Sequence, residues 1–70
     1  MSNSKHVFML VDEINDMLQK HSVGQMSTND EIELTRTVAA MLRQGVGYTP
    51  EFQLVPSSQG YFELEVSFNL

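Results

Sequence analysis

The spacing of the apolar residues changes along this 70-residue chain from a helical period to a strand period, and that change limits the class of fold. From Val7 to His21 the apolar side chains recur every three or four residues, which places them along one side of a helix. From Tyr61 to Leu70 every second residue is apolar, which is typical of a strand with one buried face. The sequence therefore predicts an α+β fold, with helices first and strands last.

The first predicted helix spans about residues 5–21. Ser4 is its predicted N-cap, because a side-chain hydroxyl there can accept a hydrogen bond from the first turn. The helix has to end before Gly24, which can adopt the left-handed conformation that terminates helices. The predicted buried stripe of this helix consists of Val7, Leu10, Val11, Ile14, Met17 and Leu18.

The second predicted helix spans about residues 28–44. Thr28 and Glu31 have the spacing of a capping box, and Gly45 is placed to follow the C-cap. The link to the first helix is short, so we expect the two helices to be antiparallel neighbours. The predicted buried stripe consists of Leu34, Thr35, Val38, Met41 and Leu42.

Two strands are predicted at about residues 51–55 and 61–69. The segment between them, Pro56 to Gly60, has the composition of a turn, so the strands should form a β-hairpin. The complete chain, residues 1–70, is then a single domain with the order α-α-β-β. The face that should pack on the helices carries Phe52, Leu54, Phe62, Leu64, Val66 and Phe68.

Small size and an open strand edge both favour a homodimer. A chain of this length buries only about 60% of the surface that its unfolded form exposes. It contains no cysteine, so no disulfide can add stability. The strand edge from Phe62 to Phe68 would remain unpaired, although Glu63 and Glu65 partly protect it. We expect two copies to share a four-stranded sheet across a two-fold axis.

The net charge of the chain limits the classes of molecule that it can bind. Nine acidic residues against four basic ones give a net charge of -5, which opposes binding to nucleic acid and favours a protein partner with a basic surface. No apolar run reaches the roughly 18 residues of a membrane span, and Met1 to His6 lack the pattern of a signal peptide. We therefore expect no membrane partner and a cytoplasmic location.

No group of residues predicts catalysis, a cofactor or a metal. Asp12 and Asp16 are one helical turn apart, but no further carboxylate is placed to complete a cation site. His6 and His21 lie near opposite ends of the first predicted helix, more than about 20 Å apart if that segment is helical, and cannot share a metal ion within one chain. The chain contains neither a nucleophile elbow nor a glycine-rich phosphate loop. We expect a protein that is not an enzyme.

Four residues are candidates for contact with a partner: Phe8, Met9, Arg43 and Tyr48. Phe8 and Met9 widen the apolar surface of the first helix beyond what one neighbour can cover, and the alternative is that both pack beneath the hairpin. Arg43 could anchor a partner or remain a solvated surface residue. Tyr48 could be presented by its loop or fold over the end of the core.

In size, acidity, lack of catalytic motifs and the helical layout from Val7 to Leu42, the chain resembles small phage-encoded inhibitors of host regulators, of the quorum-sensing anti-activator type. The resemblance implies a non-enzymatic inhibitor that binds a host transcriptional activator in the host cytoplasm. Two alternatives remain open. One is a structural or assembly subunit that uses its C-terminal edge strand. The other is a small two-helix DNA-binding regulator, which the acidic start of the second helix disfavours.

Overall fold

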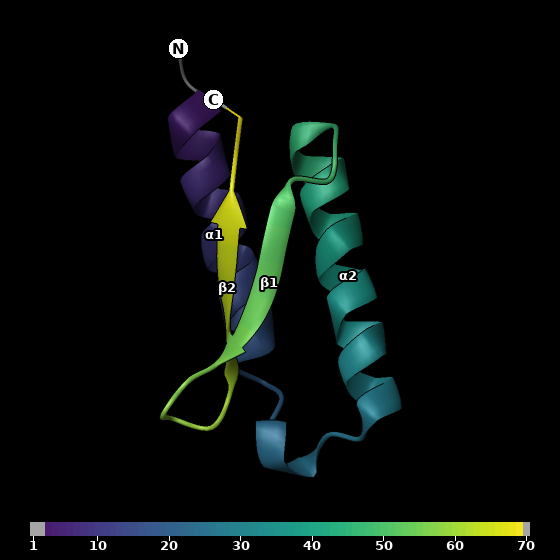
Figure 1. The fold of residues 1–70 in the computed structure, drawn as a ribbon. Coiled ribbons are helices and arrows are strands. Elements are labelled where there is room, and N and C mark those ends of the chain that lie inside the picture. The colour runs from purple at the N-terminus through teal and green to yellow at the C-terminus, as the bar shows by residue number, and fades with distance from the viewer. Residues whose placement is uncertain (1–2, 70) are drawn as a thin grey trace.

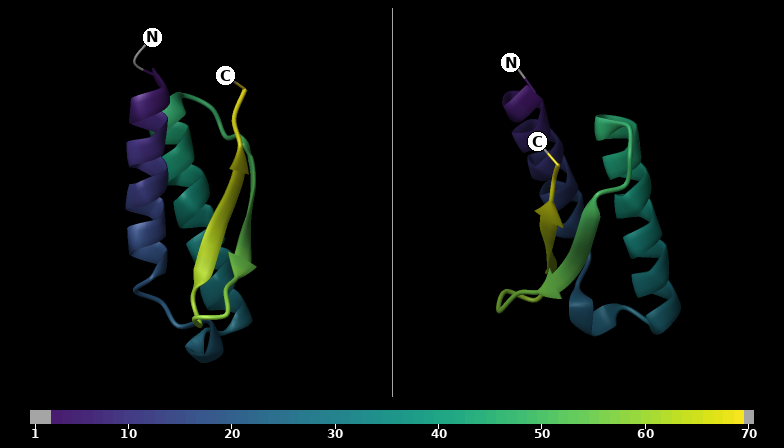
Figure 2. Two further views of the ribbon diagram at one scale, coloured as in Figure 1. Left: turned by 90° about the vertical axis from the view of Figure 1, so that its left-hand side faces the viewer. Right: turned by 45° about the horizontal axis from the view of Figure 1, so that its top comes forward.

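The computed structural model describes residues 3–69 and contains two helices followed by a two-stranded antiparallel sheet. The helices form one layer and the β-hairpin packs against it as the other (Figures 1 and 2). The predicted α+β class and the α-α-β-β order are confirmed, with a short 3-10 turn between the helices. The elements are α1 (Asn3–Leu18), η1 (Val23–Gln25), α2 (Thr28–Val46), β1 (Glu51–Pro56) and β2 (Phe62–Ser67).

Helix α1 is shorter at its end than the sequence predicts. It stops at Leu18 because the hydrogen bonds tighten there: Lys20 and His21 each donate their backbone N–H to the carbonyl oxygen three residues earlier, at 3.1 Å. At the other end, Ser4 lies inside the helix and is not its N-cap. After α1 the linker is tied to the hairpin, since Val23 donates its backbone N–H to the Gly60 carbonyl at 2.8 Å.

The N-cap of helix α2 lies one residue earlier than the sequence predicts. Ser27, not Thr28, is the N-cap. Its Oγ accepts from the Asp30 backbone N–H at 3.1 Å, and an Asp30 carboxylate oxygen accepts from the Ser27 N–H at 3.2 Å. The predicted partner Glu31 takes no part in this capping box.

The end of α2 also differs from the prediction. Gly45 is still helical, and Gly47 ends the helix in the left-handed conformation with a φ of 84°. A Cβ atom on Gly45 would collide with the side chain of Leu10, so the glycine is needed for close approach of α1. Gly45 therefore allows the two helices to pack closely and does not end helix α2.

The β-hairpin has the predicted faces and slightly different ends. Phe52 pairs with Val66 and Leu54 with Leu64 on the face toward the helices. A three-residue turn joins the strands: the Ser57 N–H donates to the Tyr61 carbonyl at 2.9 Å, and Gly60 has a φ of 93°. Strand β2 runs from Phe62 to Ser67 rather than over 61–69, and β1 extends to Pro56.

The core is tight between the helices and looser under the sheet. Ile14, Leu18, Val38 and Leu42 are fully buried, and Phe62 joins them from β2. The prediction that Thr35 belongs to this core is wrong: its side chain is exposed and its hydroxyl donates to the Glu31 carbonyl at 2.9 Å. The remaining residues of the inner sheet face are only partly buried: Phe52, Leu54, Leu64, Val66 and Phe68.

The outer edge of β2 is held by α1. The Leu64 backbone N–H points away from β1 and donates to Oδ1 of Asn15 at 3.1 Å. The strand edge that the sequence predicts to be open is thus capped in its middle by a helix side chain. No side chain among residues 3–69 caps the corresponding edge of β1 in this way.

Candidate protein-binding surface

The described residues expose two neighbouring apolar side chains on α1. Phe8 is 70% exposed and Met9 is 56% exposed, although both belong to a regular helix. The alternative in which they pack beneath the hairpin is therefore wrong. Ile32 on α2, at 45%, is a third large apolar residue that the fold leaves exposed.

Exposed carboxylates follow the exposed apolar side chains of α1 by one helical turn. Asp12 follows Phe8 by four residues, and Glu13 follows Met9 by four, so each carboxylate lies one turn away on the same side of the helix. Both are exposed, as is Asp16. Among residues 3–69 the only ion pair joins Arg36 to Glu33, so these α1 carboxylates are not neutralised by a described basic side chain. We call Phe8, Met9, Asp12, Glu13 and Asp16 the acidic α1 face.

Phe8 and Met9 point in different directions from the helix axis. Phe8 is seven residues before Asn15 and so lies on the same side of α1, the side that meets β2. Met9 is rotated by about 100° from it, toward the surface that faces away from the core. A partner that contacts both side chains must therefore wrap around this part of α1.

Arg43 lies on a separate surface. It is exposed on α2, seven residues after Arg36, and therefore on the same side of that helix. Arg36 contacts Glu33 at 3.5 Å with both side chains about three-quarters exposed, a geometry that contributes little to stability. Ile32, one turn before Arg36, completes this mixed apolar and basic face of α2.

Tyr48 closes the loop after α2 rather than presenting its ring freely. The side chain is half-buried, and its hydroxyl oxygen accepts a hydrogen bond from the Asn69 backbone N–H at 3.0 Å. The interpretation that this ring folds over the end of the core is the one that agrees with the structure. Phe8 and Met9 belong to the first half of α1, whereas Arg43 and Tyr48 lie near the end of α2 and just after it. The start of α1 and the end of α2 lie at the same end of the molecule (Figure 1), but the four predicted residues do not form one surface.

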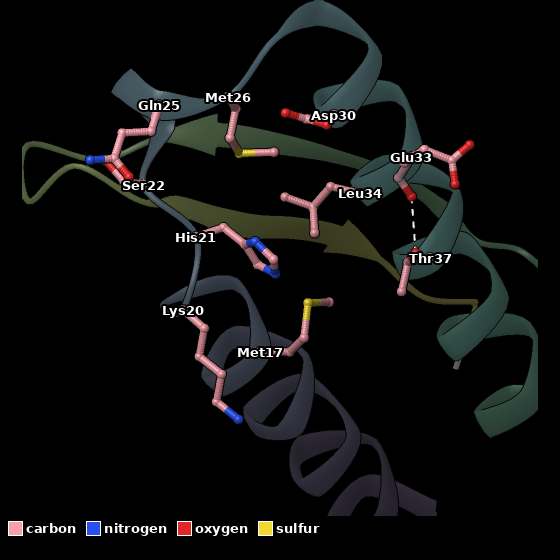
Figure 3. A pocket seen from close by; sticks show the side chains of 10 residues that line it. All are labelled: Met17, Lys20, His21, Ser22, Gln25, Met26, Asp30, Glu33, Leu34 and Thr37. Atoms are coloured by element: carbon pink, nitrogen blue, oxygen red, sulfur yellow. Dashed lines mark hydrogen bonds between the residues drawn. The ribbon is translucent and has the colours of Figure 1, made fainter.

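A cleft at the opposite end was not predicted. It lies between the end of α1, the linker and the start of α2, and its volume is about 550 Å³ (Figure 3). Met17, Met26 and Leu34 provide apolar lining. The polar lining comes from both sides: Lys20 and His21 follow α1, whereas Asp30, Glu33 and Thr37 belong to α2.

Little in the sequence indicates this cleft. Met17 fits the apolar stripe of α1, so periodicity assigns it to the core. Met26 precedes the capping box and belongs to no periodic pattern. Its position before the N-cap, where an apolar residue commonly packs back on the helix, was the available signal.

The titratable groups of the described chain do not assemble into a metal site. No three histidine, aspartate or glutamate side chains among residues 3–69 come together as ligands. His6 instead joins the helices, because its Nε2 lies 2.8 Å from the carbonyl oxygen of Gly45. His21 lines the cleft at the other end.

Comparison with known proteins adds no relative to this description. No protein-family model matches the chain, and neither a curated protein nor a solved structure matches it. Within residues 3–69, neither helix has the length and apolar character needed to cross a membrane.

Proposed function

We propose that this protein is a non-enzymatic modulator that binds another protein through the acidic α1 face. The observation that carries the proposal is the exposure of Phe8 on an ordered helix. Large aromatic side chains and methionine are enriched where proteins contact one another, and the cores of interfaces commonly contain them. Phe8 and Met9 would supply the apolar anchors of such a contact.

The charge around these anchors defines the partner. Asp12, Glu13 and Asp16 follow the apolar side chains along α1, and the whole chain carries a net charge of -5. Complementary potentials raise association rates and disfavour partners of the same sign. The partner we propose has a basic surface with an apolar recess that accepts Phe8.

The basic surface of a DNA-binding domain fits this description. Occupying that surface with an acidic protein would compete with DNA for the same arginine and lysine side chains. Together with the resemblance to phage-encoded anti-activators, this supports a chain from a phage or mobile element that inhibits a host transcriptional activator in the host cytoplasm. The inhibition requires no chemical step.

The proposal is tested by a capture experiment followed by a competition assay. Immobilised protein should retain a basic DNA-binding protein from host lysate. The purified partner should then lose its DNA binding as this chain is added. Phe8→Ala should weaken the partner's affinity about 30-fold or more, the effect of a central aromatic anchor. Unchanged DNA binding in the presence of saturating wild-type protein would refute the proposal.

Ile32→Ala is the matched control for Phe8→Ala. Both substitutions truncate an exposed apolar side chain in a helix, but Ile32 lies on α2, away from the acidic α1 face. The control should bind the partner as the wild type does. Equal losses for the two variants, or none for Phe8→Ala, would remove the acidic α1 face from the proposal.

The two alternatives have less support. A subunit that assembles through β2 would have to displace Asn15 from the Leu64 N–H. A DNA-binding regulator would bring the exposed carboxylates of Asp30, Glu31 and Glu33 toward phosphate groups. We also propose that the chain forms a homodimer.

A further inference from the structure

The hydrogen-bonding pattern of the hairpin determines which backbone groups of β1 face outward. Residues 57 and 61 form a hydrogen-bonded pair, since the Ser57 N–H donates to the Tyr61 carbonyl. The Leu64 N–H points away from β1. In an antiparallel ladder bonded and non-bonded pairs alternate, so Leu54 with Leu64 and Phe52 with Val66 are non-bonded pairs. The N–H and carbonyl groups of Phe52 and Leu54 therefore point away from β2.

These outward groups of β1 have no partner within residues 3–69. No hydrogen bond from the Phe52 or Leu54 backbone N–H to another described residue is present, whereas the equivalent edge of β2 is capped by Asn15. The backbone of α2 does not pack closely on β1: the closely packed pairs are β1 with β2, α1 with β2, and α1 with α2. Four polar backbone groups are thus left at one edge of the sheet.

We propose that β1 pairs with β1 of a second copy of this chain, antiparallel and around a two-fold axis at Gln53, to give the strand order β2-β1-β1-β2. The inference supplies the interface of the proposed homodimer. It does not depend on the acidic α1 face or on any host protein. The second copy is favoured as the occupant because the edge is complementary to itself, as three features show.

The first feature is the arrangement of donors and acceptors. With the axis at Gln53, Phe52 lies opposite Leu54 of the second copy, and each residue donates and accepts. All four outward groups on each chain are then satisfied. An axis at Leu54 would instead place Phe52 opposite Pro56, which has no N–H to donate.

The second feature is charge. Although each copy has a net charge of -5, this register places no two like charges directly opposite. Gln53 meets Gln53 across the axis, and Glu51 meets Val55. Pro50 and Pro56 flank the paired segment and end the ladder on both sides, which disfavours slipped registers.

The third feature is burial. Phe52 and Leu54 are only half-buried on the inner sheet face, and in this register they become cross-strand neighbours in the dimer. The axes of neighbouring helices lie about 8–10 Å apart, whereas neighbouring strands lie only about 4.8 Å apart. A two-stranded sheet is therefore too narrow to cover the inner face of two helices. A strand added beside β1 extends the sheet toward α2 (Figure 1).

A single cysteine tests this interface, because the chain contains none of its own. In the proposed dimer the Cα atoms of the two Gln53 residues form a non-bonded pair about 4.5 Å apart, within disulfide range. Gln53→Cys should therefore oxidise to a covalent dimer. Glu63→Cys is the matched control: it has the same exposed sheet face but lies on β2, and should stay monomeric on a denaturing gel.

A second pair of variants tests the register in which the two β1 strands pair. Light scattering tests whether the chain forms a dimer in solution. Glu51→Cys mixed with Val55→Cys should give a mixed disulfide in excess of either self-linked dimer. The wild type should have twice the chain mass and dissociate on dilution. A monomer at every concentration would overturn the proposal, and so would cross-linking through Glu63→Cys in place of Gln53→Cys. A dimer in which neither cysteine set links would place the interface elsewhere and overturn it equally.

Discussion

The two ends of the helical hairpin are packed in opposite ways. At the closed end, the start of α1 and the end of α2, Leu10 lies directly against Gly45 and the ring of His6 contacts the Gly45 carbonyl oxygen. At the open end, the end of α1 and the start of α2, Met17 and Leu34 line a cleft of about 550 Å³. The left view of Figure 2 shows the helices side by side near the termini and diverging toward the linker.

The difference shows how side-chain volume sets the distance between helices. Gly45 has no side chain, so α1 can approach the backbone of α2 closely. At the open end both helices carry large side chains, and Met26 of the linker lines the cleft together with Met17 and Leu34. The closed end gains close packing, while the open end keeps apolar surface accessible to solvent.

The largest effect is expected from filling the contact at the closed end. Gly45→Val should destabilise the protein by about 3 kcal/mol, because its side chain would displace the buried Leu10 and a β-branched residue is unfavourable in a helix. Urea denaturation measures this change. Gly24→Ala is the control: a Cβ there meets no atom within 4 Å, so its effect should stay within about 0.5 kcal/mol. A Gly45→Val protein as stable as the wild type would contradict the close packing.

A smaller effect is expected at the open end. Met26→Ala should cost about 1.5 kcal/mol, below the 2–5 kcal/mol typical of a fully buried methionine, since Met26 is only partly buried and borders the cleft. Thermal unfolding followed by circular dichroism would measure it. A loss as large as that of Gly45→Val would show that the open end is packed as tightly as the closed end.

How much of this could be read from the sequence depends on the range of the interactions. Periodicity alone predicted the buried residues Ile14, Leu18 and Val38, because a helix repeats its environment every few residues. The role of Gly45 could not be read in this way, since it depends on Leu10, which is distant in sequence. Long-range contacts of this kind decide where helices meet and where they part.

The candidate surfaces also depend on contacts between residues that are distant in the sequence. The exposure of Phe8 and Met9 was left open by the sequence, because an apolar residue beside a helical stripe can pack under a neighbouring element or face solvent. Likewise, a strand pattern predicts a sheet edge but not which edge is capped: Asn15, which bonds Leu64, gives no signal in the sequence. Only the packing of α1 on β2 distinguishes the two edges.

The smallest effect tests a local interaction at the open end. Ser27→Ala should destabilise the protein by about 1 kcal/mol, because the Asp30 N–H loses its side-chain acceptor at the start of α2. Thr28→Ala, at the residue that the sequence predicts as the cap, should change stability by no more than about 0.5 kcal/mol, since Thr28 already lies inside the helix. Urea denaturation of both variants gives the comparison. Equal losses would mean that the two hydroxyls share the cap, and the reverse order would restore the capping box predicted from Thr28 and Glu31.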